Sequence, residues 1–174
     1  MLPSYRNLGP IKGLKEVGEV IYRRSIQHRR TCMLVKKGFR ILPLMHPCSR
    51  DLTAVKIKTS SGEGPREIIL GWAYLPFDYV EPPPPGELEK LVMSCRAEGT
   101  HLIIGCDANA HHTSWGSMNI NKRGEFLFNY IMANGLDITN RGDRPTFVTS
   151  NRQEVIDITT ATLYAGNFIR LACN

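Results

Sequence analysis

Residues 101–117 constrain the fold and the chemistry of this chain more than any other stretch, because a short apolar run leads directly into closely spaced polar groups. The apolar residues 102–104 predict a buried strand. Asp107 and Asn109 follow two residues apart, and if the strand geometry lasts through Asn109, both side chains point to the same face. A carboxylate and an amide in that arrangement can bind a divalent cation and orient a water for attack on a phosphate. The alternative is a polar strand end at which the two side chains cap turns.

Composition and charge fit one globular domain with a polyanionic partner. The chain has 174 residues and is 42% hydrophobic, which is enough to bury a sizeable core, so we expect one domain over residues 1–174. Lys and Arg number 22 against 16 Asp and Glu, and the formal net charge of +6 favours a polyanion such as DNA. The basic pairs at residues 23–24, 29–30 and 36–37 are either DNA contacts or solvated turns.

The cysteines and the apolar runs address compartment and membrane association. The five cysteines are scattered without Cys-x-x-Cys spacing, which favours reduced, buried thiols over a zinc site or a disulfide framework. The sequence has no signal-peptide pattern and no apolar run long enough to cross a membrane. We therefore expect an intracellular, monomeric protein with no membrane partner.

Strand and helix patterns alternate along the chain. Turn residues at 60–65 separate two strand patterns and predict an antiparallel hairpin. Leu88, Leu91, Val92 and Cys95 fall at helical spacing before Gly99, and a second helix is expected at residues 124–133. This mixture favours a layered α/β fold. The expected strands are 19–22, 31–35, 52–58, 67–74, 101–107, 136–139, 146–149 and 155–160.

Five short motifs follow one another in a fixed order. They are Trp-Ala-Tyr-Leu-Pro-Phe at 72–77, Gly-Cys-Asp-Ala-Asn-Ala-His-His at 105–112 with Trp-Gly-Ser at 115–117, Asn-Lys-Arg-Gly-Glu at 121–125, Asn-Arg-Gly at 140–142 with Pro-Thr-Phe-Val at 145–148, and Val-Ile-Asp-Ile-Thr at 155–159. In this order they resemble the endonuclease/exonuclease/phosphatase superfamily, and in particular the endonuclease domain of non-LTR (LINE-like) retrotransposon polyproteins. Each motif alone is weak, but five in order are specific. The resemblance runs from about Gly9 to the end of the chain.

The resemblance implies a fold, an activity and partners. The fold would be a four-layer α/β sandwich, with two packed mixed β-sheets flanked by helices. The activity would be Mg²⁺-dependent (or Mn²⁺-dependent) hydrolysis that nicks target DNA, so that the 3′ hydroxyl of the nick primes reverse transcription. A reverse transcriptase domain would belong to the full-length polyprotein, and the protein would be nuclear when it acts on genomic DNA.

The same resemblance implies roles for four residues. Asp107 would activate the attacking water, and Asn109 would orient that water or contact the metal. Tyr74 would reach the phosphate from a neighbouring strand end, although a strand-end tyrosine with its hydroxyl at the surface fits the pattern too. Asp157 lies between two isoleucines, and because a buried lone carboxylate is costly, it needs a partner. In the family that partner is the catalytic His, whose imidazole the Asp orients.

Three further residues are candidates for contact with nucleic acid. His111 and His112 would lie in a loop that faces DNA or phosphate, and packing or capping roles are equally good interpretations. Arg123 is either a phosphate contact or part of a salt bridge at the start of a helix.

Two motifs of the family are absent from this sequence. The family's first metal-binding residue is a Glu in a Gln-Glu-Pro-like strand end, and residues 9–14 here resemble the segment just after it. The family's Ser-Asp-His motif, which supplies a metal-binding Asp and the catalytic His, would lie beyond Leu-Ala-Cys-Asn at 171–174. We therefore expect a domain that is incomplete at both ends. The alternatives are a catalytically inactive fragment that only binds DNA, and another phosphoesterase of the superfamily that acts on lipid or nucleotide; the Trp-Gly-Ser and Pro-Thr-Phe contexts argue against the latter.

Overall fold

The structure is a computed structural model that describes residues 18–22, 25–44, 46, 48–61 and 64–162. Segment 9–14 and the chain end at 171–174, both discussed above, lie outside the described residues. Neither helix in the described ranges has the length and apolar character that a membrane crossing requires.

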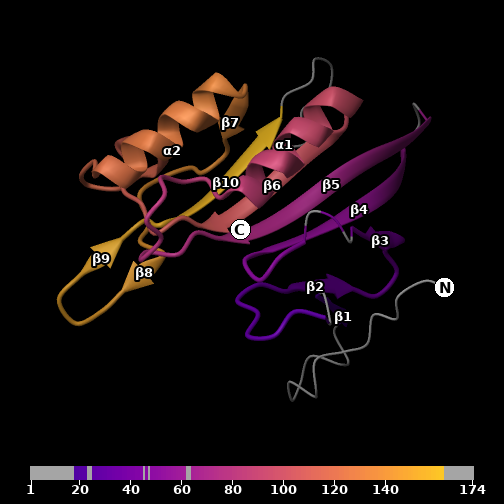
Figure 1. Cartoon of the computed structure of the whole chain (residues 1–174), viewed down its shortest axis with the longest axis horizontal. Helices are drawn as coiled ribbons and strands as arrows, with labels where there is room; N and C mark the ends of the chain where they lie inside the picture. Colours follow the sequence, from indigo (N-terminus) through magenta and orange to yellow (C-terminus); the bar gives the residue numbers. More distant parts are fainter. Residues whose placement is uncertain (1–17, 23–24, 45, 47, 62–63, 163–174) are drawn as a thin grey trace.

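A six-stranded mixed sheet organises the described chain (Figure 1). Its strand order is β3-β4-β5-β6-β10-β7, and only the central pair β5 and β6 is parallel. The expected hairpin is confirmed, since β4 and β5 pair in antiparallel register along their full lengths. The strands are β3 (Ile41–Pro43), β4 (Leu52–Ser61), β5 (Gly64–Tyr74), β6 (His101–Asp107), β7 (Leu136–Ile138) and β10 (Asp157–Thr162).

Both α-helices cover one face of this sheet, as Figure 1 shows. Helix α1 (Gly86–Glu98) ends at Gly99, whose left-handed backbone closes its last turn, and helix α2 (Lys122–Ala133) begins at the N-cap Asn121. The apolar stripes of both helices and the alternate residues of the central strands form one buried cluster. Its members include Leu91, Val92, Leu102, Ile104, Cys106, Leu127, Ile131 and Ile158.

The other face of the sheet lies opposite a small second sheet, which β1 (Gly18–Ile21) and β2 (Met33–Lys36) form as an antiparallel pair. An apolar groove separates β2 from this face, and Trp72 and Gly105 lie in its wall. The Trp72 ring covers Gly105 so closely that a Cβ there would lie 2.5 Å from a ring carbon. The layered α/β class is therefore confirmed, and in the described residues the second sheet has two strands.

Most expected elements are present, but the sequence patterns missed the short ones. They missed β3, the 3₁₀ turn η1 (Thr113–Trp115), and β9 (Gln153–Glu154), which pairs with β8 (Phe147–Val148) in a hairpin that extends away from the main sheet in Figure 1. Such strands have two or three residues, too few for an alternation to be recognised. Helix α2 begins two residues earlier than expected because Asn121 caps it.

Candidate active site

Three of the predicted site residues lie side by side at one end of the large sheet. Tyr74 is in register with Asp107 across the parallel strands β5 and β6, and Asp107 is in register with Asp157 across the antiparallel strands β6 and β10. Because Cys106 faces the helices, strand alternation turns Asp107 and its register partners toward the opposite face. Segments far apart in sequence thus bring one phenol and two carboxylates to a single place, on the side of the β1–β2 layer.

Asp107 is a partly buried carboxylate with unsatisfied hydrogen-bonding capacity. Its Oδ1 atom is buried and has no hydrogen-bond partner among the described residues. Burial raises the pKa of Asp107, the charge of Asp157 raises it further, and the backbone N–H of Asn109 partly offsets both. A buried acceptor without a donor is costly, and two like charges in register repel, so this position favours a proton or a cation.

Asn109 does not lie on the strand, and the condition that strand geometry lasts through it is wrong. Strand β6 ends at Asp107, and Asn109 adopts a positive φ of 45°. Asn109 tolerates this left-handed conformation better than most residues. Its Nδ2 donates to the carbonyl oxygen of Leu75 at 3.2 Å, while the Leu75 N–H donates to the carbonyl of Asp107 at 2.9 Å. Asn109 therefore stays beside Asp107 through a turn that closes onto the end of β5.

Asp157 is held by hydroxyl and amide groups. The Thr146 hydroxyl accepts hydrogen bonds from the backbone N–H groups of Ile156 and Asp157, both at 3.1 Å. Asn140 donates to the Asp157 carbonyl at 2.9 Å and accepts from the N–H of Thr159 at 2.6 Å. Burial raises the pKa of Asp157, and a hydrogen bond with Thr146 partly offsets the rise. Thr146 and Asn140, both from the fourth of the five sequence motifs, therefore fix the start of β10 opposite Asp107.

Arg30 contacts Tyr74, a relationship that sequence reasoning missed. Its guanidinium carbon lies 4.6 Å from the centroid of the Tyr74 ring, and its Nη2 atom donates to Oδ2 of Asp51 at 2.6 Å. The hydrogen bond with Asp51 raises the pKa of Arg30, so this cation is permanent. The sequence showed only a basic pair at 29–30, and no local pattern indicates which ring one of its members covers.

Arg123 brings a second cation to the same region from the first turn of α2. Its Nε lies 3.5 Å from the carbonyl oxygen of Ala108, just after Asp107. Burial lowers the pKa of Arg123, while the nearby Tyr74 hydroxyl raises it. Among the described residues no carboxylate forms an ion pair with Arg123, so the helix-start salt bridge is not observed. The other interpretation, a phosphate contact, stays a prediction.

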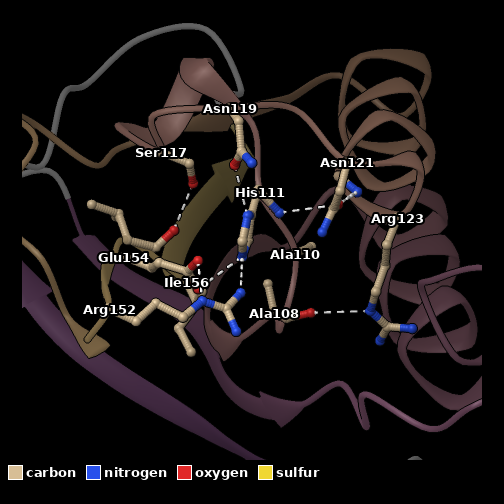
Figure 2. A network of polar contacts seen from close by, with 12 residues as sticks. Ala108, Ala110, His111, Ser117, Asn119, Asn121, Arg123, Arg152, Glu154 and Ile156 are labelled. Carbon is tan, nitrogen blue, oxygen red and sulfur yellow. Dashed lines mark hydrogen bonds and ion pairs between the residues drawn. The ribbon is translucent and has the colours of Figure 1, made fainter. Parts of the chain in front are cut away.

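His111 and His112 are buried and engaged within the protein. Figure 2 shows His111 between Asn119 and Glu154, with distances of 2.8 Å from Nδ1 to Oδ1 and 2.9 Å from Nε2 to Oε2. The ring of His112 stacks on Phe128 with centroids 4.2 Å apart. Burial lowers the pKa of His112, and its Nδ1 accepts from the N–H of Ser114. Packing and capping thus describe the contacts that the structure shows for both residues, and their expected contact with nucleic acid stays a prediction.

The N-terminus of α2 is docked directly on the loop that follows Asp107. The side chain of Asn121 accepts from the N–H of Gly124 at 2.7 Å and from the N–H of His111 at 3.2 Å (Figure 2). A Cβ at Gly124 would lie 1.8 Å from the carbonyl oxygen of His111, so only glycine allows this approach. The Asn-x-Arg-Gly motif therefore holds the loop after Asp107 against the start of α2 and places Arg123 beside that loop.

The residues present fit part of a divalent metal site. Asp107 offers hard carboxylate oxygens, of which Oδ1 has no hydrogen-bond donor among the described residues, and Asp157 lies in register with it. No group of three or more His, Cys, Asp or Glu residues that could hold a metal ion occurs in the part of the chain that the structure describes. The described site thus has the chemistry of a cation site without a full set of carboxylate ligands.

Comparison with known proteins identifies one similar solved structure. The chain is similar to the solved endonuclease domain of TRAS1, a telomere-specific non-LTR retrotransposon, at 29% sequence identity and a TM-score of 0.63. The match covers 75% of this chain and 59% of the TRAS1 chain, so this chain spans less than two thirds of that structure. No curated protein matches the sequence.

Two other solved structures are less similar. They are the human Nocturnin catalytic domain with bound sulfate, at 13% identity and a TM-score of 0.41 over 75% of this chain and 51% of that one, and truncated Caenorhabditis elegans TDP2, at 11% identity and a TM-score of 0.42 over 86% and 63%. At these values neither bears on the chemistry of this chain.

A family model assigns the chain more directly. The model described as endonuclease-reverse transcriptase matches residues 79–165, which is half of the chain and includes Asp107, Asn109, Arg123 and Asp157. The motif order, the layered α/β fold and the TRAS1 likeness point the same way. The chain therefore belongs to the endonuclease-reverse transcriptase family, with a fold of the endonuclease/exonuclease/phosphatase type.

Proposed function

We propose that this chain is part of a metal-dependent DNA endonuclease domain of a non-LTR retrotransposon, which nicks target DNA so that the 3′ end primes reverse transcription. The observation that supports it most is the register of Tyr74, Asp107 and Asp157 on three adjacent strands. A reverse transcriptase domain in the same polyprotein and a nuclear site of action belong to this proposal.

Asp107 is the central residue of the proposed reaction. Asp107 and Asn109 would hold Mg²⁺ or Mn²⁺, which supplies neutralisation of the phosphate charge. Asp107 would also take the proton of the attacking water, a task that suits a carboxylate at a strand end with an Oδ1 atom that has no donor among the described residues. Asn109 is fixed to the end of β5 and keeps its amide beside the Asp107 carboxylate.

Tyr74 and Arg123 would bind the scissile phosphate. The phenol donates a hydrogen bond to a phosphate oxygen, and the Arg123 guanidinium offers donors that no carboxylate occupies among the described residues. Asp157 would orient the imidazole of a catalytic histidine. His111 and His112, the two buried histidines of the described chain, are held by other contacts, so neither is expected to take this role.

A plasmid assay tests the proposal. Supercoiled DNA is incubated with Mg²⁺ and either the 174-residue chain or a chain extended on both sides by its own coding sequence, since the present chain spans 59% of the TRAS1 structure. The extended chain should produce nicked circles, and the 174-residue chain should produce few or none. Without magnesium, or with Ca²⁺ in its place, the nicked product of the extended chain should fall to background.

The second candidate function is DNA binding without catalysis. The net charge of +6 favours it independently of the carboxylates. Non-specific affinity should then fall steeply between low and high salt, because bound cations are released from the phosphates. A chain that binds DNA in this way but does not nick even when extended would support the second candidate and contradict the first.

A further inference from the structure

Tyr74 is held at two points by one neighbouring residue, Asp51. The backbone N–H of Tyr74 donates to the Asp51 carbonyl at 2.8 Å. The Asp51 carboxylate accepts hydrogen bonds from two nitrogens of Arg30, from Nε to Oδ1 at 2.5 Å and from Nη2 to Oδ2 at 2.6 Å. Arg30 in turn lies over the Tyr74 ring. The main chain of Asp51 therefore fixes the tyrosine backbone, and its side chain fixes the cation that covers the ring.

The segment that carries Arg30 is docked independently of this pair. The N–H of Arg30 donates to the carbonyl of Arg50 at 2.9 Å, and the hydroxyls of Thr31 and Thr53 lie 3.0 Å apart in a buried contact. The side chains of Arg30 and Asp51 are 30% and 23% exposed, so water competes only partly for their hydrogen bonds. The position of Arg30 over the ring is thus built by the segment before β2 and by the start of β4.

We propose that Arg30 and Asp51 are positioning residues that hold the Tyr74 ring in the orientation needed to contact the scissile phosphate. This rests on the proposed endonuclease function. The planar guanidinium can bind a carboxylate through two parallel hydrogen bonds while its face stacks on an aromatic ring, and a lysine ammonium cannot do both. The pair restricts rotation of the ring, so the phenol oxygen stays at the Asp107 end of the sheet.

A simple electrostatic role for Arg30 makes a different prediction. If Arg30 only attracted DNA, Arg30→Lys would be nearly neutral, and Asp51→Asn would strengthen binding because it removes a negative charge. A positioning role requires both variants to be defective in the same way. Arg30→Lys and Asp51→Asn should each lower kcat about tenfold or more while KM changes little, since a small misplacement of a reacting group is costly. The kcat of the double variant should be little lower than that of either single variant, because each single variant already breaks the interaction between Arg30 and Asp51.

A second readout does not depend on catalysis. In the 174-residue chain with isotope-labelled tyrosine rings, the Tyr74 signals are identified by their loss in Tyr74→Phe. Arg30→Lys and Asp51→Asn should both shift these signals. Arg29→Lys is the matched control, because Arg29 lies next in sequence and its guanidinium carbon is 4.3 Å from the centroid of a different ring, that of Tyr22. The control should shift the Tyr22 signals, leave those of Tyr74 in place and keep kcat at the wild-type value.

The two readouts separate failure of the inference from failure of the proposed function. Unchanged Tyr74 signals, or shifted signals with an unchanged kcat in the extended chain, would overturn the positioning role. If Tyr74→Phe nicks as well as wild type, Tyr74 is not a phosphate contact and the positioning role falls with it, while the endonuclease function itself is still decided by Asp107. Shifted Tyr74 signals together with a lowered kcat in both variants would support the positioning role of Arg30 and Asp51.

Discussion

Asp107 and Asp157 face each other in direct register across the antiparallel strands β6 and β10. Opposed carboxylates on neighbouring strands destabilise a sheet, by about 0.2–1 kcal/mol for an ordinary cross-strand pair. Here burial raises the pKa of both side chains, and Oδ1 of Asp107 has no donor among the described residues. The strand ends that place these residues together thus leave an arrangement that a proton or a cation would relieve.

This arrangement predicts that removing one charge stabilises the fold at neutral pH. A carboxyl with a raised pKa in the folded state contributes stability below the ordinary aspartate pKa, and this is lost as pH rises through the raised value. Asp107→Asn should therefore be more stable than wild type near pH 7, with the difference shrinking toward about pH 4. Urea unfolding at both pH values measures it. An equal difference at both would be inconsistent with a raised pKa of Asp107. Asp137→Asn, which removes a carboxylate from an exposed site on β7, is the matched control.

A divalent cation should stabilise the folded chain by binding at Asp107, where its charge would also offset the repulsion from Asp157. Because a ligand that binds only the folded state raises its stability, Mg²⁺ at about ten times its dissociation constant should add about 1.4 kcal/mol. Thermal unfolding with and without MgCl₂ should show a higher Tm for wild type and for Asp137→Asn, but not for Asp107→Asn. An equal Tm increase in all three proteins would mean that the cation binds elsewhere.

Gly124 should not tolerate even one methyl group. The added Cβ would lie 1.8 Å from the carbonyl oxygen of His111, so α2 and the loop after Asp107 must move apart. We expect Gly124→Ala to cost about 1–3 kcal/mol of unfolding free energy. Gly86→Ala is the control, because Gly86 also lies in the first turn of a helix but has nothing within 4 Å of its Cβ position. That variant should be neutral or slightly more stable; a similar loss in both would argue against the docked loop.

The Thr146 hydroxyl should be needed for the position of Asp157. Thr146→Val leaves the N–H groups of Ile156 and Asp157 without their acceptor, which should cost about 0.5–1.5 kcal/mol for each lost hydrogen bond. Nicking by the extended chain should fall, because the start of β10 loosens opposite Asp107. Thr149→Val changes a hydroxyl in the same exposed hairpin that donates to the carbonyl of Arg152 over a long 3.4 Å, and this variant should be close to wild type. Equal nicking by the two variants would mean that the Thr146 hydroxyl is not needed for the position of Asp157.

Local patterns predicted the long elements, because these follow from alternation and helical spacing. Motif order marked Asp107 and Asp157 separately, and the register of β6 and β10 places them opposite each other. The strand 101–107 and the hairpin before it were readable. The conformation of Asn109 was not, since a positive φ depends on the turn that closes onto Leu75. His111 contacts Glu154, and the guanidinium of Arg30 lies over the Tyr74 ring. Such contacts join segments distant in sequence and leave no periodic signal.

The central claim is that Asp107 is the catalytic carboxylate of a DNA endonuclease. Nicking by the extended chain with Asp107→Ala tests it most directly. The control is Asp137→Ala, which removes an exposed aspartate from the same sheet. With supercoiled plasmid and Mg²⁺, wild type and Asp137→Ala should convert circles to the nicked form at similar rates. Asp107→Ala should lower the rate by orders of magnitude, because in the proposed reaction the Asp107 carboxylate would hold the cation and take the proton of water. Undiminished nicking by Asp107→Ala would contradict the account.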